Sequence, residues 1–235
     1  MPAAASAAAA GLSDFSIGTD TAGSIRLPAS FCGLWGFRPS HGVLSSQGVV
    51  PLSPSFDTPG WMSKSLDHFS RVGAVLLPPD QNEAEFGGLK LALPEDIWRL
   101  VHPGFESVLK PFVDRIAGFF HGTVKDSLSQ GRLIEWQDAF RLVQGHEAWS
   151  LHGAWIRSQK PELGPGIKER FDWASTIQDE QAHVARTDMM RNAEAVNHYL
   201  DDAIICMPTV SYLAPQKGHA SSAEDRTHAL SLLCI

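Results

Sequence analysis

Ser24 closes a run of small and polar residues, Gly-Thr-Asp-Thr-Ala-Gly-Ser at 18–24, that follows a short apolar stretch. The glycines and the alanine of this run let a substrate carbonyl approach the backbone closely. Successive N–H groups in such a turn can converge on a developing oxyanion. The residue types therefore favour acyl transfer with Ser24 as the nucleophile. The same residue types are ordinary turn formers, so the short run alone leaves a purely conformational role open.

A longer stretch of sequence separates these two interpretations. The segment GTDTAGSIRLPAS at 18–30, followed by FCGLWGFRPSHGVLSSQGVVPLSPSFDTPGW at 31–61, closely resembles the signature of the amidase signature family of serine hydrolases. The resemblance continues to about residue 77. Enzymes of that family hydrolyse amides with a Ser–Ser–Lys triad, in which a lysine acts through a bridging serine on the nucleophilic serine.

The resemblance implies a role for each residue around the turn. Ser24 matches the nucleophile, which attacks the amide carbonyl and forms an acyl-enzyme. The oxyanion hole of the family matches the backbone of three residues, Thr21, Ala22 and Gly23. The polar positions that brace the loop and keep the nucleophile aimed match the side chains of Thr19, Asp20 and Arg26.

The other two members of the triad have no counterpart in this chain. The bridging serine of the family would fall just before Met1, and every lysine of the chain follows Ser24. Near the other end, DAIICMPTVSYLAP at 202–215 resembles a late strand and loop after which family members continue. We therefore expect an amidase domain truncated at both ends, with negligible activity of the 235-residue chain alone.

The substrate is expected to be a small-molecule amide. The segment HGAWIRSQKPELGPGIKERF at 152–171 more loosely resembles indoleacetamide-hydrolase-like amidases, which implies an aryl-acetamide such as indole-3-acetamide. Three side chains of the same region, Trp149, His152 and Trp155, are candidates to line a pocket for an aryl ring. Packing against the core is the alternative for these rings, and it is the preferred interpretation for the other tryptophans at Trp35, Trp61, Trp98, Trp136 and Trp173.

Two other functions remain open. In a Ser–His–Asp arrangement, Ser24 would be activated by His41 or His152, with Asp20 or Asp57 orienting the imidazole. The chain could instead be a non-catalytic docking module or a truncated gene product. A chloroplast import receptor that resembles the family is such a module, but it lacks the nucleophile that Ser24 supplies here.

Apolar periodicity and turn residues predict the elements that position these groups. The expected helices lie at about 3–11, 28–33, 66–77, 104–120, 133–158 and 166–200. The expected strands lie at 13–17, 89–93 and 203–207. Strands separated by helices indicate an α/β fold with a mixed central sheet flanked by helices.

The chain is expected to form a single partial domain over 1–235. Residues 1–77 would form the core that carries the nucleophile loop. Residues 78–200 would be mainly helical on the substrate side, and 201–235 would hold a return strand and the start of a C-terminal part.

Charge and hydropathy exclude two classes of partner. The formal charge is −7, and a chain that is acidic overall and has no basic patch is a poor ligand for phosphate backbones, so no nucleic acid is expected. No window approaches the roughly 18 apolar residues of a membrane span, so no membrane partner is expected.

Cysteine and histidine spacing bears on redox and metal chemistry. Cys32, Cys206 and Cys234 lie in apolar surroundings without a CxxC spacing, which predicts buried, reduced thiols and favours a cytoplasmic location. His146 and His152 are six residues apart, so they do not share a helix face as a metal-binding i, i+4 pair would. Neither a metal nor a cofactor is predicted.

Overall fold

The first of two sheets contains the strand that leads into the run ending at Ser24. In the computed structural model, which describes residues 2–79, 86–164 and 166–216, the strands of this sheet are β1 (Phe15–Asp20), β2 (Trp35–Phe37) and β3 (Thr58–Ser63). Their order is β1–β3–β2, and both pairs are antiparallel. Trp61 on the central strand lies opposite Ile17 on one side and Phe37 on the other.

Helices cover both faces of this sheet. On one face, α1 (Pro2–Ala9) and α2 (Arg26–Phe31) enclose a small apolar cluster made of Ala5, Ile25, Ala29 and Met62. On the other face lies α3 (Leu66–Leu76), whose first turn is capped because the Ser65 hydroxyl accepts a hydrogen bond from the N–H of His68 at 3.3 Å. The Trp61 indole N–H donates to the carbonyl of Phe69 in α3 at 3.1 Å, which ties this helix to the central strand.

The second sheet is parallel and has the order β5–β4–β6. Its strands are β4 (Lys90–Ala92), β5 (Gly122–Val124) and β6 (Ala203–Ile205). A short 3₁₀ helix, η1 (Phe86–Gly88), precedes β4, and two helices, α4 (Glu95–Trp98) and α5 (Pro103–Ala117), connect β4 to β5. The return from β5 to β6 runs through the three helices α6 to α8.

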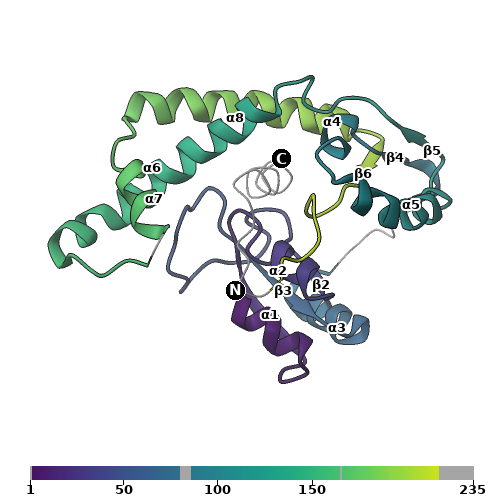
Figure 1. Cartoon of the computed structure of the whole chain (residues 1–235), viewed down its shortest axis with the longest axis horizontal. Coiled ribbons are helices and arrows are strands. Elements are labelled where there is room, and N and C mark those ends of the chain that lie inside the picture. Colours follow the sequence, from purple (N-terminus) through teal and green to yellow (C-terminus); the bar gives the residue numbers. More distant parts are fainter. Residues whose placement is uncertain (1, 80–85, 165, 217–235) are drawn as a thin grey trace.

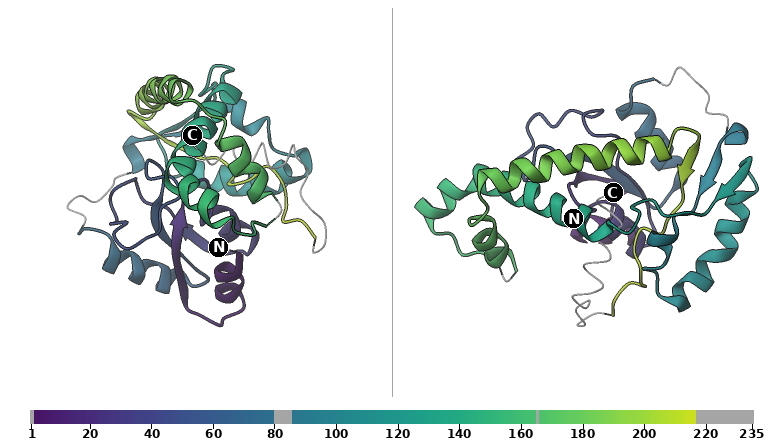
Figure 2. Two further views of the ribbon diagram at one scale, coloured as in Figure 1. Left: turned by 90° about the vertical axis from the view of Figure 1, so that its left-hand side faces the viewer. Right: turned by 90° about the horizontal axis from the view of Figure 1, so that it is seen from above.

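A long helical pair lies between β5 and β6 in the chain. The helices α6 (Leu133–Gln159) and α8 (Asp179–Tyr199) lie side by side, and α7 (Ile167–Ala174) packs against α6 where the chain turns back. Ala139, Val143 and Ala185 form the buried contact between α6 and α8. Figure 1 shows this pair across the top and upper left of the molecule, with α8 leading toward β6, and Figure 2 shows the pair from two further directions.

The expected α/β class is confirmed, although the described strands form two separate three-stranded sheets in place of one central sheet. The single helix expected at 166–200 is two helices. The break follows from the local backbone: Gln178 is extended (φ −88°, ψ 151°), and its N–H is capped by the Gln181 side chain at 2.9 Å. The expected C-terminal part at 201–235 is described only to Gln216, and β6 is its return strand.

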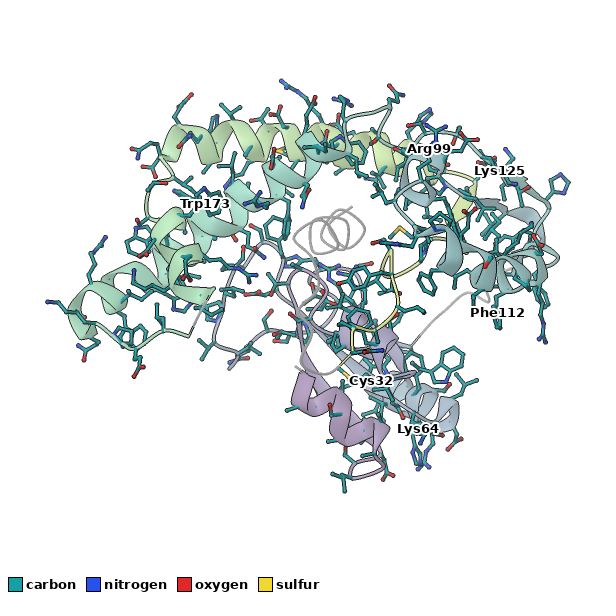
Figure 3. All side chains as sticks on the ribbon, in the orientation of Figure 1. Cys32, Lys64, Arg99, Phe112, Lys125 and Trp173 are labelled. Carbon is teal, nitrogen blue, oxygen red and sulfur yellow. The ribbon has the colours of Figure 1, made fainter. Side chains whose placement is uncertain are left out.

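Packing of the tryptophans and cysteines differs in part from expectation. Trp61 and Trp136 are buried, but Trp35 is 52% exposed. Trp173, labelled in Figure 3, is 39% exposed and lies between α7 and α6. The cysteines expected to be buried are free thiols that are only half-buried at Cys32 and Cys206, while Cys234 lies outside the described residues. Burial still raises the pKa of the Cys206 thiol.

Candidate active site

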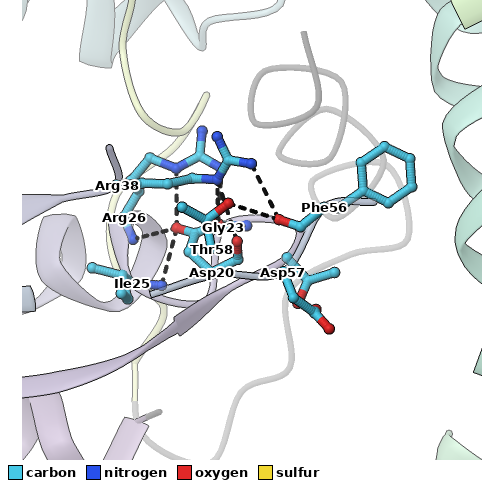
Figure 4. Close-up of polar contacts among 9 residues, drawn as sticks. Asp20, Gly23, Ile25, Arg26, Arg38, Phe56, Asp57 and Thr58 are labelled. Atoms are coloured by element: carbon cyan, nitrogen blue, oxygen red, sulfur yellow. Dashed lines mark hydrogen bonds and ion pairs between the residues drawn. The ribbon is translucent and has the colours of Figure 1, made fainter. Parts of the chain in front are cut away.

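Residues 20–25, from the last residue of β1 to the residue before α2, form a tight turn that we call the nucleophile turn. Asp20 is fully buried at the end of β1, and its carboxylate lies under the turn. It accepts hydrogen bonds from the backbone N–H groups of Gly23 at 2.6 Å, Ile25 at 3.2 Å and Arg26 at 3.1 Å (Figure 4). One side chain therefore satisfies three backbone donors, two in the turn and one at the first residue of α2, which holds the backbone of the turn in a single arrangement.

The charge of Asp20 is balanced by Arg26. The guanidinium donates through Nε to Oδ2 at 3.0 Å and through Nη2 to Oδ1 at 2.9 Å, in the bidentate geometry that arginine and carboxylate favour. Burial raises the pKa of Asp20, but the hydrogen bonds and positive charge of Arg26 more than offset this, so the pKa is lowered overall. The hydrogen bonds of Asp20 and Arg26 thus hold the backbone of the turn in place, and the loop-bracing role in catalysis assigned to both residues from the sequence stays a prediction.

Ser24 is exposed at the apex of the nucleophile turn, between buried Gly23 and buried Ile25. Gly23 has a φ of 103°, a backbone conformation that residues other than glycine rarely adopt, so the turn requires glycine there. The turn thereby holds the Ser24 hydroxyl at the surface, where a substrate could reach it. The N–H of Gly23 is directed to Asp20, so in this structure it does not point toward a substrate.

The remaining residues assigned around the turn lie close to it in the chain but differ in environment. Ala22 is half-buried, and Thr19 is half-buried in β1 opposite Pro59. Thr21 is buried, and its hydroxyl donates to Asp57 Oδ1 at 2.5 Å. Thr21 thus connects the nucleophile turn to a segment more than thirty residues later.

Arg38 supplies a second connection between the turn and the segment before β3. Its Nε donates to the carbonyl of Asp20 at 3.3 Å, and its Nη2 donates to the carbonyl of Phe56 at 3.2 Å (Figure 4). This residue was not among the sequence-derived candidates. Each of these carbonyls is eighteen residues from Arg38 in the chain, one before it and one after it. Contacts over such distances cannot be predicted from the residues next to Arg38 in a single sequence.

The pocket candidates on α6 make contacts of their own. His152 Nε2 lies 2.8 Å from the carbonyl oxygen of Pro51, Trp149 stacks under the Arg157 guanidinium at 5.1 Å, and Trp155 is 53% exposed. A cavity of about 430 Å³ lies elsewhere, beside α4 and α5. It is lined by Leu93, Glu95, Trp98, Arg99, Glu106, Lys110, Val113, Asp114 and Lys125. None of the three α6 candidates lines that cavity, and their role in substrate binding remains a prediction.

The Ser–His–Asp alternative finds no support within the described residues. His41 Nε2 lies 2.9 Å from the carbonyl oxygen of Pro54, and His152 is engaged by the neighbouring carbonyl at Pro51. In the part of the chain that the structure describes, no hydrogen bond joins either imidazole to Ser24 or to the carboxylates proposed to orient it. Both histidines instead hold the loop that precedes β3.

The described residues contain no group of three histidine, cysteine, aspartate or glutamate side chains placed to hold a metal ion. Within the same residues, none of the helices has both the length and the apolar character that crossing a membrane requires.

Asp202, which is paired with Lys90, and three less exposed carboxyl groups have lowered pKa values in the folded chain, and we expect these three to make the stability of the chain sensitive to acid. For Asp20, Asp96 and Glu147, burial raises the pKa, but their hydrogen bonds outweigh burial and lower it below the ordinary values of 3.8 for aspartate and 4.5 for glutamate. The unfolded chain therefore takes up protons first as the pH decreases. The stabilisation from these groups is complete above the ordinary values and is lost as the pH falls through the folded pKa values.

Melting temperatures measured from pH 7 to pH 2.5 would check this expectation. We expect a level region near neutrality and a decline that begins at about pH 4.5 and steepens below it. The variant Asp20→Asn should show a shallower decline because one of the titrating groups is gone. A melting temperature that does not change between about pH 4.5 and pH 2.5 would contradict the lowered pKa values.

The chain is similar in sequence to known amidases and to a chloroplast translocon protein. A family model described as Amidase matches residues 4–90, a range that contains the nucleophile turn and the loop before β3. A protein named Amidase 1 from Arabidopsis thaliana is 36% identical over a stretch that covers 97% of this chain and 61% of the relative. A protein of Pisum sativum named Translocon at the outer membrane of chloroplasts 64 is 31% identical, covering 99% of this chain and 44% of the relative.

The fold has a counterpart among solved structures. A crystal structure of an amidase superposes with a TM-score of 0.80 at 22% identity, covering 98% of this chain and 56% of that chain. At this identity the superposition shows a shared fold and nothing about substrate. The chain spans about three fifths of the Arabidopsis protein and somewhat more than half of the solved structure.

Proposed function

The chain belongs to the amidase signature family, and on that basis we propose that Ser24 is the nucleophile of an enzyme that hydrolyses a carboxylic acid amide. The Ser24 oxygen adds to the carbonyl carbon, and the carbon–nitrogen bond then breaks, so that protonated nitrogen leaves as ammonia and an ester forms on Ser24. Water attacks this ester, releasing the carboxylic acid and restoring the serine. The observation that carries the proposal is the exposed Ser24 hydroxyl at the apex of a turn held by buried Asp20.

Backbone donors near Ser24 would stabilise the tetrahedral oxyanion. Because the Gly23 N–H is occupied by Asp20, we assign this role to the neighbouring N–H groups of Ala22 and Ser24. The substrate would be an aryl-acetamide, with Trp149 and His152 on α6 as candidate neighbours of its ring. This finer assignment rests on the loose resemblance of 152–171 to indoleacetamide hydrolases.

The chain alone is proposed to lack the base that would activate Ser24. The lysine and bridging serine that the family uses upstream of the nucleophile have no match in these 235 residues, and all the lysines follow Ser24. Two of these lysines are in ion pairs, Lys90 with Asp202 and Lys168 with Asp172. Removal of the base side of a catalytic triad costs several orders of magnitude in rate.

A fluorophosphonate probe tests the role of Ser24, with mass spectrometry to locate the modified residue. We expect slow labelling of Ser24 in the purified chain and no label at that peptide in Ser24→Ala. Ser30→Ala is the matched control, because Ser30 is also exposed but lies on α2 beyond the turn; it should be labelled like the unmodified chain. Hydrolysis of indole-3-acetamide should stay near the background rate.

The outcomes are separable. A folded chain whose Ser24 remains unmodified even after prolonged incubation with a large excess of the probe would contradict the nucleophile assignment. Rapid amide hydrolysis that is lost in Ser24→Ala would confirm the nucleophile but overturn the proposal that the chain alone lacks its base.

A docking module without catalysis is the second candidate. The similarity to the pea translocon protein, which extends over 99% of this chain, favours it. A docking module has no need of a reactive serine, so the probe should then ignore Ser24. The exposed serine and the fully bonded carboxylate beneath it favour the enzyme.

A further inference from the structure

The last part of the segment between β2 and β3, which we call loop 51–57, is held by a carboxylate that lies some ninety residues later in the chain. Glu147 on α6 accepts hydrogen bonds from the Ser53 hydroxyl at 2.6 Å, the Ser55 hydroxyl at 2.5 Å and the Ser55 N–H at 3.1 Å. Its side chain is only 11% exposed. Hydrogen bonds to a charged, poorly hydrated acceptor are among the strong ones in proteins, so this contact fixes the loop firmly against the helix.

The neighbouring helix completes the contact. Arg186 on α8 donates through Nη2 to Glu147 Oε1 at 2.7 Å and through Nη1 to the Ser55 hydroxyl at 3.3 Å. His152, one and a half turns after Glu147 on α6, contacts the Pro51 carbonyl at the start of the loop. The α6–α8 pair therefore holds loop 51–57 at two places.

The other end of the loop is bonded to the nucleophile turn. Asp57 Oδ2 accepts from the N–H groups of Leu52 at 2.7 Å and Ser53 at 2.9 Å, which closes the loop on itself. Asp57 Oδ1 accepts from the Thr21 hydroxyl at 2.5 Å. Ser53 is common to both ends, because its hydroxyl donates to Glu147 and its N–H donates to Asp57.

We propose that Glu147 is a positioning residue for the nucleophile turn and that it acts through Ser53 and Asp57 on Thr21. The chain of hydrogen bonds is continuous from helix to turn, and each polar atom in it has a partner. The catalytic meaning of this role rests on the proposed function, since aiming the turn matters only if Ser24 reacts. The coupling itself does not depend on any reaction and can be measured without one.

Substitution of Glu147 by glutamine tests the coupling with little change in shape. One oxygen is replaced by an NH₂ group, which cannot accept the hydrogen bonds that the serine hydroxyls and Arg186 donate to the carboxylate. Hydrogen exchange followed by mass spectrometry reads out the turn amides that Asp20 binds, those of Gly23 and Ile25. We expect these amides to exchange about tenfold faster in Glu147→Gln than in the unmodified chain, because the turn opens more often.

A carboxylate on the same helix provides the matched control. Asp138 lies on α6 in an exposed pair with Arg141 at 3.6 Å and is not bonded to loop 51–57. Asp138→Asn should leave exchange of the turn unchanged. The amide of Cys206, which donates to Ala92 in the second sheet, should exchange at the same rate in all variants.

A milder variant keeps the proposal falsifiable if Glu147→Gln does not fold. Ser53 is buried, and Ser53→Ala removes the hydroxyl that bonds the loop to Glu147 while leaving Arg186 paired with Glu147 and the Ser53 N–H bonded to Asp57, so we expect a smaller acceleration at the same turn amides. The double variant Thr21→Val with Glu147→Gln should exchange no faster than Glu147→Gln alone, because both changes interrupt one path.

Three results would overturn the proposal. The first is exchange of the turn at the unmodified rate in folded Glu147→Gln or folded Ser53→Ala. The second is equal acceleration throughout the chain, including Cys206, which would show a general loss of stability. The third is full additivity of Thr21→Val and Glu147→Gln. Failure of the fluorophosphonate test at Ser24 would not change these hydrogen-exchange results. The nucleophile role of Ser24 and the positioning role of Glu147 are therefore tested separately.

Discussion

Replacement of Asp20 by asparagine is expected to lower the free energy of unfolding by about 3 kcal/mol. The side chain of Asp20 is fully buried and accepts five hydrogen bonds, three from backbone N–H groups and two from the Arg26 guanidinium. Asparagine has the same shape but only one oxygen. Its NH₂ group would face donors, so several N–H groups would be left buried without an acceptor, and Arg26 would lose its counter-charge.

The size of this effect follows from two opposing terms. Burying the carboxylate is itself costly, so the net contribution of the pair to stability is modest. Breaking a buried pair by removing one partner nevertheless costs about 3–5 kcal/mol, because the other charge is left behind. Arg26 is about one quarter exposed and can recover some hydration, which places the expected loss at the lower end.

Urea unfolding monitored by tryptophan fluorescence would measure the loss. Asp14→Asn is the matched control, because Asp14 is an aspartate close to the same strand whose side chain is 79% exposed and lies 3.8 Å from His68. We expect its effect to stay within about 0.5 kcal/mol. Similar values for the two variants would show that the carboxylate of Asp20 does not hold the nucleophile turn.

Local parts of the site could be predicted from the sequence because their residues are close together in the chain. Asp20, Gly23 and Arg26 lie within seven consecutive residues, and a turn in that run can be predicted from its residue types without knowledge of the fold. The helix expected at 66–77 is likewise found at 66–76, because its apolar spacing and the Ser65 cap are both local signals.

Other parts could not be predicted because their causes are not local. The segment Thr58–Ser63 contains Pro59 and Gly60, which are typical of loops, yet it forms the central strand β3. It has glycine because a Cβ at position 60 would lie 2.2 Å from the carbonyl oxygen of Phe37 on the adjacent strand. Only the position of the neighbouring strand reveals that requirement.

The link from Glu147 to the nucleophile turn was missed for the same reason. Glu147 lies on a helix among residues whose periodicity indicates only that the helix is long, and Ser53 lies in a segment that resembles an ordinary turn. Their contact depends on where α6 passes loop 51–57 in the fold, and the position of the helix relative to the loop cannot be predicted from a single sequence. The three carboxylates Asp20, Asp57 and Glu147 each bind backbone N–H groups, so the fold uses acids as acceptors around the turn.

Replacement of Trp61 by alanine is expected to lower the free energy of unfolding by about 3–5 kcal/mol. Trp61 is 1% exposed on the central strand, and its ring centroid lies 4.8 Å from that of Phe37 and 5.6 Å from that of Phe69. A Cβ at Gly73 of α3 would lie 3.1 Å from its ring, so the helix packs directly on the indole. Truncation would remove buried apolar area and leave a cavity that strand and helix close only in part.

The same substitution at Trp155 separates burial from residue type. Trp155 is 53% exposed on α6, so its loss should change the free energy of unfolding by less than about 1 kcal/mol. Urea unfolding monitored by far-UV circular dichroism suits both variants, because each removes a fluorophore. If Trp61→Ala were no more destabilising than Trp155→Ala, α3 could not depend on Trp61 for its attachment to β3. If Trp61→Ala unfolds the sheet while Trp155→Ala leaves it intact, the strand pairing that carries Asp20 to the nucleophile turn depends on this one buried ring.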